Sequence, residues 1–286
     1  MHVTPAGYRL LRSTGQTVAR SLGIIILTAF CLSPIYWMVV SSLRPHDAIF
    51  SNDLIPAHLS LESFRNIFGE QNNFGLALRN STIIAATVTA ISMSLGMAAA
   101  YALVRLRLPR KHLIATAVLA LAMFPGVAIV TPLFQVFSLL HWIDHYQAMI
   151  VPDIAFSLPL CIWMFIGFFG EVPWELEEAA MVDGCSKWQA FWRVMCPMLA
   201  PGVFTAAILI FVHAWSEYLV ASIMSQTLAS EPVTVAVAHF AGDSEYQQPF
   251  GSQMAAGVVV TLPLTIIIVL FQRRVVTGLT AGALKG

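Results

Sequence analysis

The residues whose types and spacing point most directly to a function lie in a charged segment, positions 171–201, between two strongly apolar stretches. The positions that stand out in it are Glu178, Ala179, Ala180, Asp183, Gly184 and Pro197. An alanine-rich helix carries little side chain on its surface, so another protein can approach its backbone closely. Acidic side chains in its first turns would stabilise the positive end of that helix. These features predict a surface on which a partner protein docks.

Two short helices must present these residues. Pro173 can open the first helix, because its missing N–H would be unpaired there anyway. Gly184 supplies the left-handed residue that commonly ends a helix. Ser186 and Gln189 have the spacing of a capping box, which predicts a second short helix that stops near Pro197. We therefore expect an exposed helix–turn–helix elbow. The alternative is an ordinary amphipathic interfacial helix that binds nothing.

The spacing of the elbow matches a known family signature, which reads Glu-Ala-Ala, three residues, Gly, nine residues and then Ile-x-Leu-Pro. Here Val194 replaces the Ile and Cys196 replaces the Leu, and both replacements are apolar. The segment resembles the EAA loop of inner-membrane permease subunits in binding-protein-dependent ABC importers. The resemblance implies that positions 178–184 and Pro197 belong to a coupling helix that docks in a cleft of a separate ATPase subunit.

Six charge-free stretches are long enough to cross a bilayer, for which a helix needs about 20 apolar residues. They are positions 21–43, 80–104, 113–140, 154–170, 194–216 and 246–272. The fourth is the shortest and is expected to begin before Asp153, near Met149. We predict an all-α, polytopic membrane protein with six transmembrane helices. Its parts are a cytoplasmic N-terminal segment (1–20), a transmembrane domain (21–272) that contains the cytoplasmic coupling-helix loop (171–201), and a cytoplasmic tail (273–286).

The distribution of basic residues predicts the orientation, because cytoplasmic loops carry an excess of Lys and Arg. With both termini inside, twelve of the fifteen Lys and Arg residues lie inside, and only Arg44, Arg65 and Arg79 lie outside. We expect a multi-pass protein of the inner (plasma) membrane with both termini in the cytoplasm. The elbow then lies on the side where ATP is available.

Composition and missing motifs exclude other classes of function. Hydrophobic residues make up 58% of the chain and charged ones 10%, and the zero net charge suggests no nucleic-acid partner. There is no phosphate-binding G-x-x-x-x-G-K-[ST] motif and no catalytic Ser/His/Asp or H-E-x-x-H arrangement. The four cysteines lack metal-ligand or paired spacing. We expect no enzyme, metal site or cofactor in this chain, so ATP and Mg²⁺ would bind to the partner ATPase.

The end of the fifth apolar stretch carries Trp215, Ser216, Glu217 and Tyr218. An acidic residue beside a spanning helix is costly unless it faces protein or water, so it marks a functional candidate. The run resembles the W-N-[DE]-aromatic stretch of sugar-importer permeases, with Ser216 in place of Asn. These residues could contact a sugar, anchor the chain at the interface, or hold a gate on the extracytoplasmic side. We favour a structural pairing of Glu217 at that gate.

Two further patterns leave alternatives open. Ser92, Gly96 and Ala100 recur at four-residue spacing, which lets helices approach closely in lipid. This fits packing within one subunit as well as a subunit interface. Pro125 and Pro159 interrupt apolar stretches and predict kinks, either along a translocation path or for packing alone.

The C-terminal tail is the second specific signal. It closely resembles the tail of maltose-type permeases, which reaches between the two ATPase subunits. The resemblance assigns contact with the ATPases to five positions: Gly278, Leu279, Thr280, Gly282 and Lys285. Three glycines in the last nine residues argue against a stable isolated helix. The alternative is a frayed chain end.

Together the resemblances imply the permease subunit of an ATP-driven sugar importer, with maltose or trehalose as the type of sugar. The implied partners are a second permease subunit, two ATP-binding subunits, an extracytoplasmic sugar-binding protein and the bilayer. The loops at 44–79 and 224–253 are long enough to contact that binding protein. The alternative is an ion-coupled secondary transporter, which requires ionisable residues near the midplane.

Overall fold

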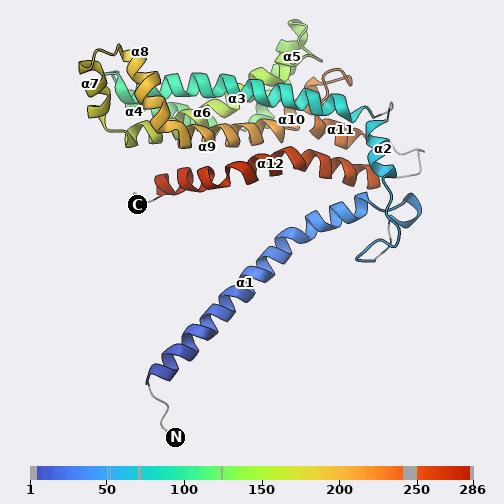
Figure 1. Cartoon of the computed structure of the whole chain (residues 1–286). Coiled ribbons are helices and arrows are strands. Elements are labelled where there is room, and N and C mark those ends of the chain that lie inside the picture. The colour runs from blue at the N-terminus through green and yellow to red at the C-terminus, as the bar shows by residue number, and fades with distance from the viewer. Residues whose placement is uncertain are drawn as a thin grey trace. The chain divides into compact units, whose positions relative to one another are not determined.

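A computed structural model describes residues 5–49, 51, 53–69, 72–123, 125–240 and 250–283. Within these residues the chain is built of helices and turns, with no strands, as predicted. It divides into two compact units (Figure 1). The first consists of Met1–Ile67 with Ala241–Val259, and the second of Phe68–Phe240 with Val260–Gly286. Helix α12 (Phe250–Ala283) contributes its first turns to one unit and the remainder to the other.

The first unit contains helix α1 (Pro5–Ser42), a short 3₁₀ turn η1 (His46–Ala48) and most of helix α2 (Glu62–Phe68). Arg44, just after α1, is 1% exposed and donates hydrogen bonds to the carbonyls of Ile49, Ser51 and Asp53. Its guanidinium also lies 4.9 Å from the centroid of the Trp37 ring. Arg44 therefore orders the loop that follows α1. Arg44 is one of the three basic residues predicted to lie outside, and this role in the loop explains why a basic residue is needed there.

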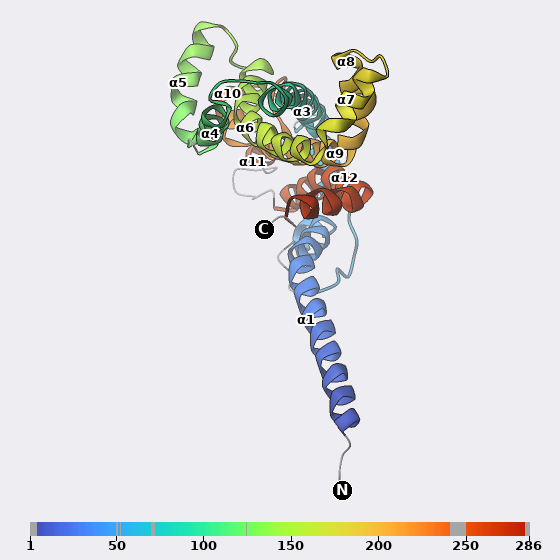
Figure 2. The same ribbon diagram turned by 90° about the vertical axis from the view of Figure 1, so that its left-hand side faces the viewer.

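The core of the second unit is formed by α3 (Phe74–Arg105), α6 (Gln147–Glu171) and α9 (Cys196–Trp215), which run side by side (Figures 1 and 2). A Cβ atom at Gly96 would lie 2.5 Å from Sγ of Cys161, so only glycine lets α3 approach α6 this closely. Ser92 and Ala100 are buried on the same face. The small-residue pattern in α3 therefore serves packing within the chain.

Five helical segments of the described chain are long and apolar enough to cross a membrane. They are Arg20–Ser42, Phe74–Arg105, Gln147–Glu171, Lys187–Met224 and Phe250–Gln272. The stretch at 113–140, expected as one span, is instead a sharply bent pair, α4 (Lys111–Ala122) and α5 (Gly126–Leu139). Pro125 lies at the break, where it cannot donate a backbone hydrogen bond. If the bent pair is one span, the total is six.

The two ends of the second unit carry different structures (Figure 1). Helices α7 (Trp174–Val182) and α8 (Lys187–Ala190) lie at one end. Helices α10 (Leu219–Met224) and α11 (Val233–His239) lie at the opposite end. The two sets of candidate residues found in the sequence are thus separated by the length of the central helices.

Candidate functional site

The elbow is formed by local interactions that the sequence predicts. Pro173 caps α7, and Gly184 follows the helix with a φ angle of +89°. The Cys185 N–H donates to the Ala180 carbonyl (3.0 Å), and the Gly184 N–H donates to the Met181 carbonyl (3.1 Å). This pair of bonds is the Schellman arrangement, which requires a left-handed residue where Gly184 lies.

The capping box predicted at the start of the second elbow helix, α8, is also confirmed. Oγ of Ser186 accepts from the Gln189 N–H (3.3 Å), and Oε1 of Gln189 accepts from the Ser186 N–H (2.9 Å). The expectation that this helix stops near Pro197 is wrong. A π-helical segment, Phe191–Met195, joins α8 to α9, and the Cys196 N–H bonds to the Phe191 carbonyl. This wider turn places Pro197 in the first turn of α9, where a missing N–H is tolerated.

The elbow presents two different faces. Glu178, Ala179, Asp183, Gly184 and Pro197 are exposed. They are accompanied by exposed apolar side chains: Val182 (87%), Trp188 (69%) and Trp192 (51%). Ala180, by contrast, is 8% exposed and packs inside the elbow. The surface open to a partner therefore includes Ala179 but excludes the side chain of Ala180.

A buried carboxylate anchors the elbow to the end of α3. Glu177 is 2% exposed, and its Oε1 accepts a hydrogen bond from the Tyr101 hydroxyl (2.6 Å). Its Oε2 lies 3.5 Å from Nε of Arg105. Arg105 also donates to the Val172 carbonyl (2.8 Å) and stacks over the ring of Trp174, 5.2 Å from its centroid. A displacement of α7 would therefore be transmitted directly to α3.

At the opposite end, Glu217 caps helix α10. Its two carboxylate oxygens accept from the backbone N–H groups of Val220 (2.8 Å) and Ala221 (3.0 Å). Its own carbonyl accepts from the Thr234 hydroxyl (2.6 Å). The structural partner expected for this acid is thus the backbone of α10. Trp215 is 3% exposed and stacks on Phe211, so its ring faces protein in this conformation.

Ser216 and Tyr218 are the exposed members of this run. Glu217, between them in the sequence, lines a cavity of about 10 Å³ together with Ser81 and Asp153. Asp153 is 1% exposed, and its Oδ1 has no hydrogen-bond partner in the described structure. A cavity of this size admits at most one water molecule.

Polar contacts from α3 and its neighbours hold the loop between α10 and α11. The Asn80 amide donates to the carbonyls of Leu228, Ala229 and Glu231, and the Tyr146 hydroxyl donates to the Asn80 side chain. Ser81 accepts from the Val233 N–H (2.9 Å). The N-terminal half of α3 thus fixes this loop, as its C-terminal end fixes the elbow.

Asp144 also holds the turn at 226–230. One oxygen accepts from the N–H groups of Gln226 and Thr227 and from the Ser230 hydroxyl, and the other accepts from the Thr227 hydroxyl. Desolvation by burial tends to raise the pKa of this carboxyl, but the hydrogen bonds from Ser230, Thr227 and Gln226 outweigh it and lower the pKa to about 2. Asp144 is therefore charged at any physiological pH.

Comparison with known proteins identifies the family. Residues 92–280, more than half of the chain, match the family described as binding-protein-dependent transport system inner membrane component. The chain belongs to this family of permeases. The permease is 41% identical over 261 residues to the trehalose transport system permease protein SugB of Mycobacterium tuberculosis, covering 91% of this chain and 95% of the relative.

A second relative agrees with this assignment, and a solved structure shares the fold. The permease is 37% identical over 266 residues to the trehalose/maltose transport system permease protein MalG of Thermococcus litoralis, covering 93% of this chain and 95% of the relative. Its fold is similar to a chain in the crystal structure of a bacterial ABC transporter involved in the import of the acidic polysaccharide alginate. That similarity has a TM-score of 0.76 at 19% identity and covers 96% of this chain and 99% of the other.

The permease is thus a multi-pass inner-membrane component without a catalytic role, and ATP binds to a separate ATPase subunit. The structure brings the predicted elbow residues together at one end. Of the tail, Gly278, Leu279, Thr280 and Gly282 fall within the bounds of α12, which carries helical backbone to Ala283 although the glycines argued against it. Lys285 lies outside the described residues.

Sequence reasoning missed the residues that connect the two ends of the permease. In the sequence, Glu177 is one of several acids at the start of the elbow, Arg105 is one of the basic residues expected in the cytoplasm, and Asn80 begins an apolar stretch, so no local motif singles them out. A polar residue at each end of a long apolar helix was the available signal. Their partners, however, lie 64 or more residues away along the chain.

Proposed function

We propose that this permease moves a disaccharide of the maltose or trehalose type from an extracytoplasmic binding protein into the cytoplasm. The assembly would contain a second permease subunit and two ATP-binding subunits that supply ATP and Mg²⁺. The observation that carries the proposal is the similarity to SugB and MalG along almost the whole chain. The names of both relatives refer to trehalose, and the name of one also refers to maltose.

Helix α3 provides a direct route for coupling. Its C-terminal end contacts the elbow through Tyr101 and Arg105, and its N-terminal half contacts the loop before α11 through Asn80 and Ser81. From Asn80 to Arg105 the helix spans about 38 Å, at 1.5 Å per residue. An ATPase that displaced the elbow would move both ends of α3 together. The elbow residues exposed to such an ATPase are Glu178, Ala179, Asp183 and Gly184.

The distribution of basic residues supports the proposed orientation. If both termini lie on the elbow side, twelve of the fifteen Lys and Arg residues lie on that side, as the excess of basic residues in cytoplasmic segments requires. The tail positions from Gly278 to Lys285 would then contact the ATP-binding subunits. The loop between α10 and α11 would face the binding protein.

Within this scheme, Glu217 belongs to a gate, and the capping of the α10 backbone by both of its oxygens supports this structural role. Ser216 and Tyr218 are exposed and remain available to a substrate or a binding protein. Membership of a binding-protein-dependent family argues against the ion-coupled secondary transporter as an alternative.

The experiment is ATP hydrolysis by the complete transporter in proteoliposomes, with its binding protein and a panel of trehalose, maltose and glucose. We expect stimulation by a disaccharide and none by glucose. The Glu217→Gln variant should change the basal rate, because its cap on α10 is weakened, and should leave the order of sugars unchanged. If a monosaccharide stimulates ATP hydrolysis most strongly, the proposal that the substrate is a disaccharide is refuted. A changed order of sugars in Glu217→Gln would refute the role of Glu217.

A further inference from the structure

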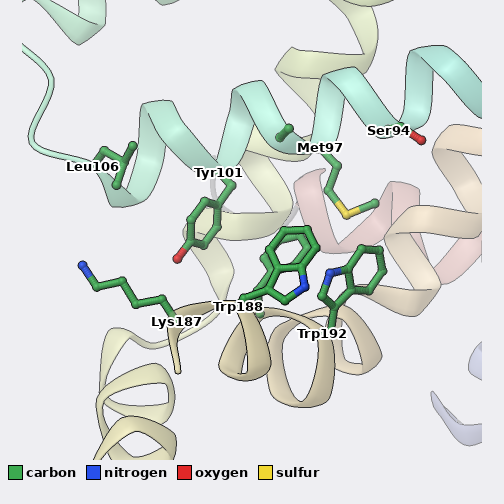
Figure 3. Close-up of a pocket in the computed structure, with 9 residues that line it drawn as sticks. Ser94, Met97, Tyr101, Leu106, Lys187, Trp188 and Trp192 are labelled. Atoms are coloured by element: carbon green, nitrogen blue, oxygen red, sulfur yellow. The ribbon is translucent and has the colours of Figure 1, made fainter. Parts of the chain in front are cut away.

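A large apolar groove lies beside the elbow, with a volume of about 390 Å³. One wall is the C-terminal half of α3, including Met97 and Tyr101, and the other carries Trp188 and Trp192 (Figure 3). Both walls belong to the same compact unit. Pockets of this size hold small molecules and are usually apolar with a few polar groups.

The groove follows one face of α3. Its lining residues Ser94, Met97, Ala98 and Tyr101 have the i, i+3, i+4, i+7 spacing of a single helical face. From Ser94 to Arg105, where the span ends, α3 rises about 16 Å. Half of the ~30 Å hydrocarbon core is about 15 Å. The groove therefore extends through one leaflet, the one on the elbow side.

The two ends of the groove differ in polarity. At the end marked by Leu106, the side chain of Lys187 extends beside the opening (Figure 3). Lys187 is exposed, as are Trp188 and Trp192. Tryptophan is enriched at the depth of the lipid headgroups, and basic pockets between membrane helices attract anionic headgroups. The charge of Lys187 thus lies at the water-facing end of the groove, while Trp188 and Trp192 line its wall towards Met97 (Figure 3).

We propose that this groove binds one acyl chain of an anionic phospholipid, with the phosphate beside Lys187. A helix is the other object that could fill an apolar groove within a membrane. A helix is about 10–12 Å in diameter with its side chains, whereas an acyl chain is a single row of methylene groups. A single acyl chain is narrow enough to enter it. The cation at the water-facing end selects a lipid with an anionic headgroup.

The bound lipid would brace the elbow. The groove is closed on one side by α3 and on the other by the second elbow helix, α8, and the π-helical segment after it. Tyr101 contributes to both the groove and the anchor of Glu177. An acyl chain between the two walls would therefore limit the movement of the elbow relative to α3.

The test uses the complete transporter in nanodiscs that contain phosphatidylglycerol or phosphatidylcholine with the same photoactivatable acyl chain. Cross-linked peptides are mapped by mass spectrometry. We expect labelling of residues 94–106 and 187–192, stronger with phosphatidylglycerol. Lys187→Ala should lower phosphatidylglycerol labelling about five-fold, because one basic residue near an anionic surface contributes ~1 kcal/mol. Arg193→Ala, an exposed cation on the same segment that does not line the groove, should leave it unchanged.

A second variant tests the acyl chain. Ala98→Phe fills the groove and should abolish labelling by both lipids, whereas Leu95→Phe, on a lipid-accessible position of α3 outside the groove, should not. Retention of the ATPase subunits shows that each variant is folded. Equal labelling by the two lipids would show that the groove does not select a lipid with an anionic headgroup. Absence of lipid labelling, with cross-linking of the second permease by a photoreactive maleimide attached at Ala98→Cys, would show that protein fills the groove. Photolabelling does not depend on which sugar is transported.

Discussion

At the scale of single residues, two neighbouring carboxylates have opposite surroundings. Glu177 is buried against Tyr101 and Arg105, whereas Glu178 is exposed and accepts a hydrogen bond from the indole of Trp174 on the elbow surface. Successive residues of a helix point about 100° apart, so one faces α3 and the next faces solvent. The Glu178 side chain is therefore available to a partner, and the Glu177 side chain is not.

This difference predicts different consequences of mutation. Glu177→Ala leaves the Arg105 guanidinium buried without its carboxylate, and breaking a buried pair in this way costs about 3–5 kcal/mol. We expect a lower thermal unfolding midpoint for the purified permease and loss of its ATPase subunits. Glu178→Ala is the matched control, because it should leave the midpoint within about 1 °C while still weakening retention of the ATPase. Equal midpoints for both variants would show that the Glu177 anchor contributes little.

The elbow also shows which residue-level features could be predicted from the sequence. Gly184, Ser186 and Gln189 act on backbone groups within five residues, so their spacing alone identifies the turn and the cap. Glu177 contacts Tyr101, which is 76 positions away. No local pattern distinguishes a buried carboxylate from an exposed one when both occupy the same helix, because the distinction is set by the packing of α7 on α3.

At the scale of elements, the turn between α7 and α8 depends on one backbone angle. A Cβ atom at Gly184 would meet no other atom within 4 Å, so the space is open and only the φ angle of +89° disfavours a side chain. Gly167 in α6 also has open space around it but no positive φ. The two glycines therefore separate the effect of conformation from the effect of packing.

Adding one methyl group at each position should have opposite results. Gly184→Ala should destabilise the elbow by about 1–2 kcal/mol, the usual cost of a left-handed L-residue. Gly167→Ala should leave stability equal or higher, because alanine favours helix. The measurements are the thermal unfolding midpoint and sugar-stimulated ATP hydrolysis by the complete transporter. A Gly184→Ala variant with unchanged stability and coupling would contradict the structural role of the turn.

The loop between α10 and α11 depends on the charge of Asp144. The folded-state pKa of this carboxyl is about 2, below its ordinary value of 3.8. A lowered pKa means that the stabilisation is fully present above about pH 4 and is lost as the pH falls from 4 towards 2. Asp144 has a φ angle of +65°, which asparagine also tolerates, so Asp144→Asn removes the charge without new backbone strain.

The pH profile of thermal unfolding checks this assignment. The unfolding midpoint of the wild type should fall as the pH drops below 4. The midpoint of Asp144→Asn should fall less over this range and should already be lower than that of the wild type at pH 7. Asp183→Asn, at an exposed acid in the elbow, is the control and should follow the wild type. Parallel curves for wild type and Asp144→Asn would show that the Asp144 hydrogen bonds do not stabilise the loop.

The elements also show where prediction from the sequence was limited. Charge-free length located α1, α3, α6, α9 and α12, because crossing a bilayer requires a long apolar helix. The kink predicted at Pro125 is present as the sharp bend between α4 and α5, but the sequence did not reveal the π-helical segment before Pro197. A proline can end, bend or begin a helix, and its neighbours in three dimensions decide which of these occurs.

At the scale of the whole molecule, the proposed direction of transport depends on the side of the membrane that the elbow occupies. The native Cys185 lies in the elbow and is partly exposed, and His58 lies in the loop after α1 and is exposed. These two positions are expected on opposite sides of the bilayer. They offer reporters that require little change to the chain.

We expect a membrane-impermeant maleimide to label His58→Cys in intact cells when the four native cysteines are replaced by alanine. A variant that retains Cys185 alone should stay unlabelled in intact cells and become labelled once the membrane is permeabilised. The reason is the twelve-to-three distribution of basic residues, which favours a cytoplasmic elbow. Permeabilisation is the necessary control, since a docked ATPase could also protect Cys185. Labelling of Cys185 but not of His58→Cys in intact cells would place the elbow outside, where no cytoplasmic ATPase could reach Glu178, and would refute the proposed coupling.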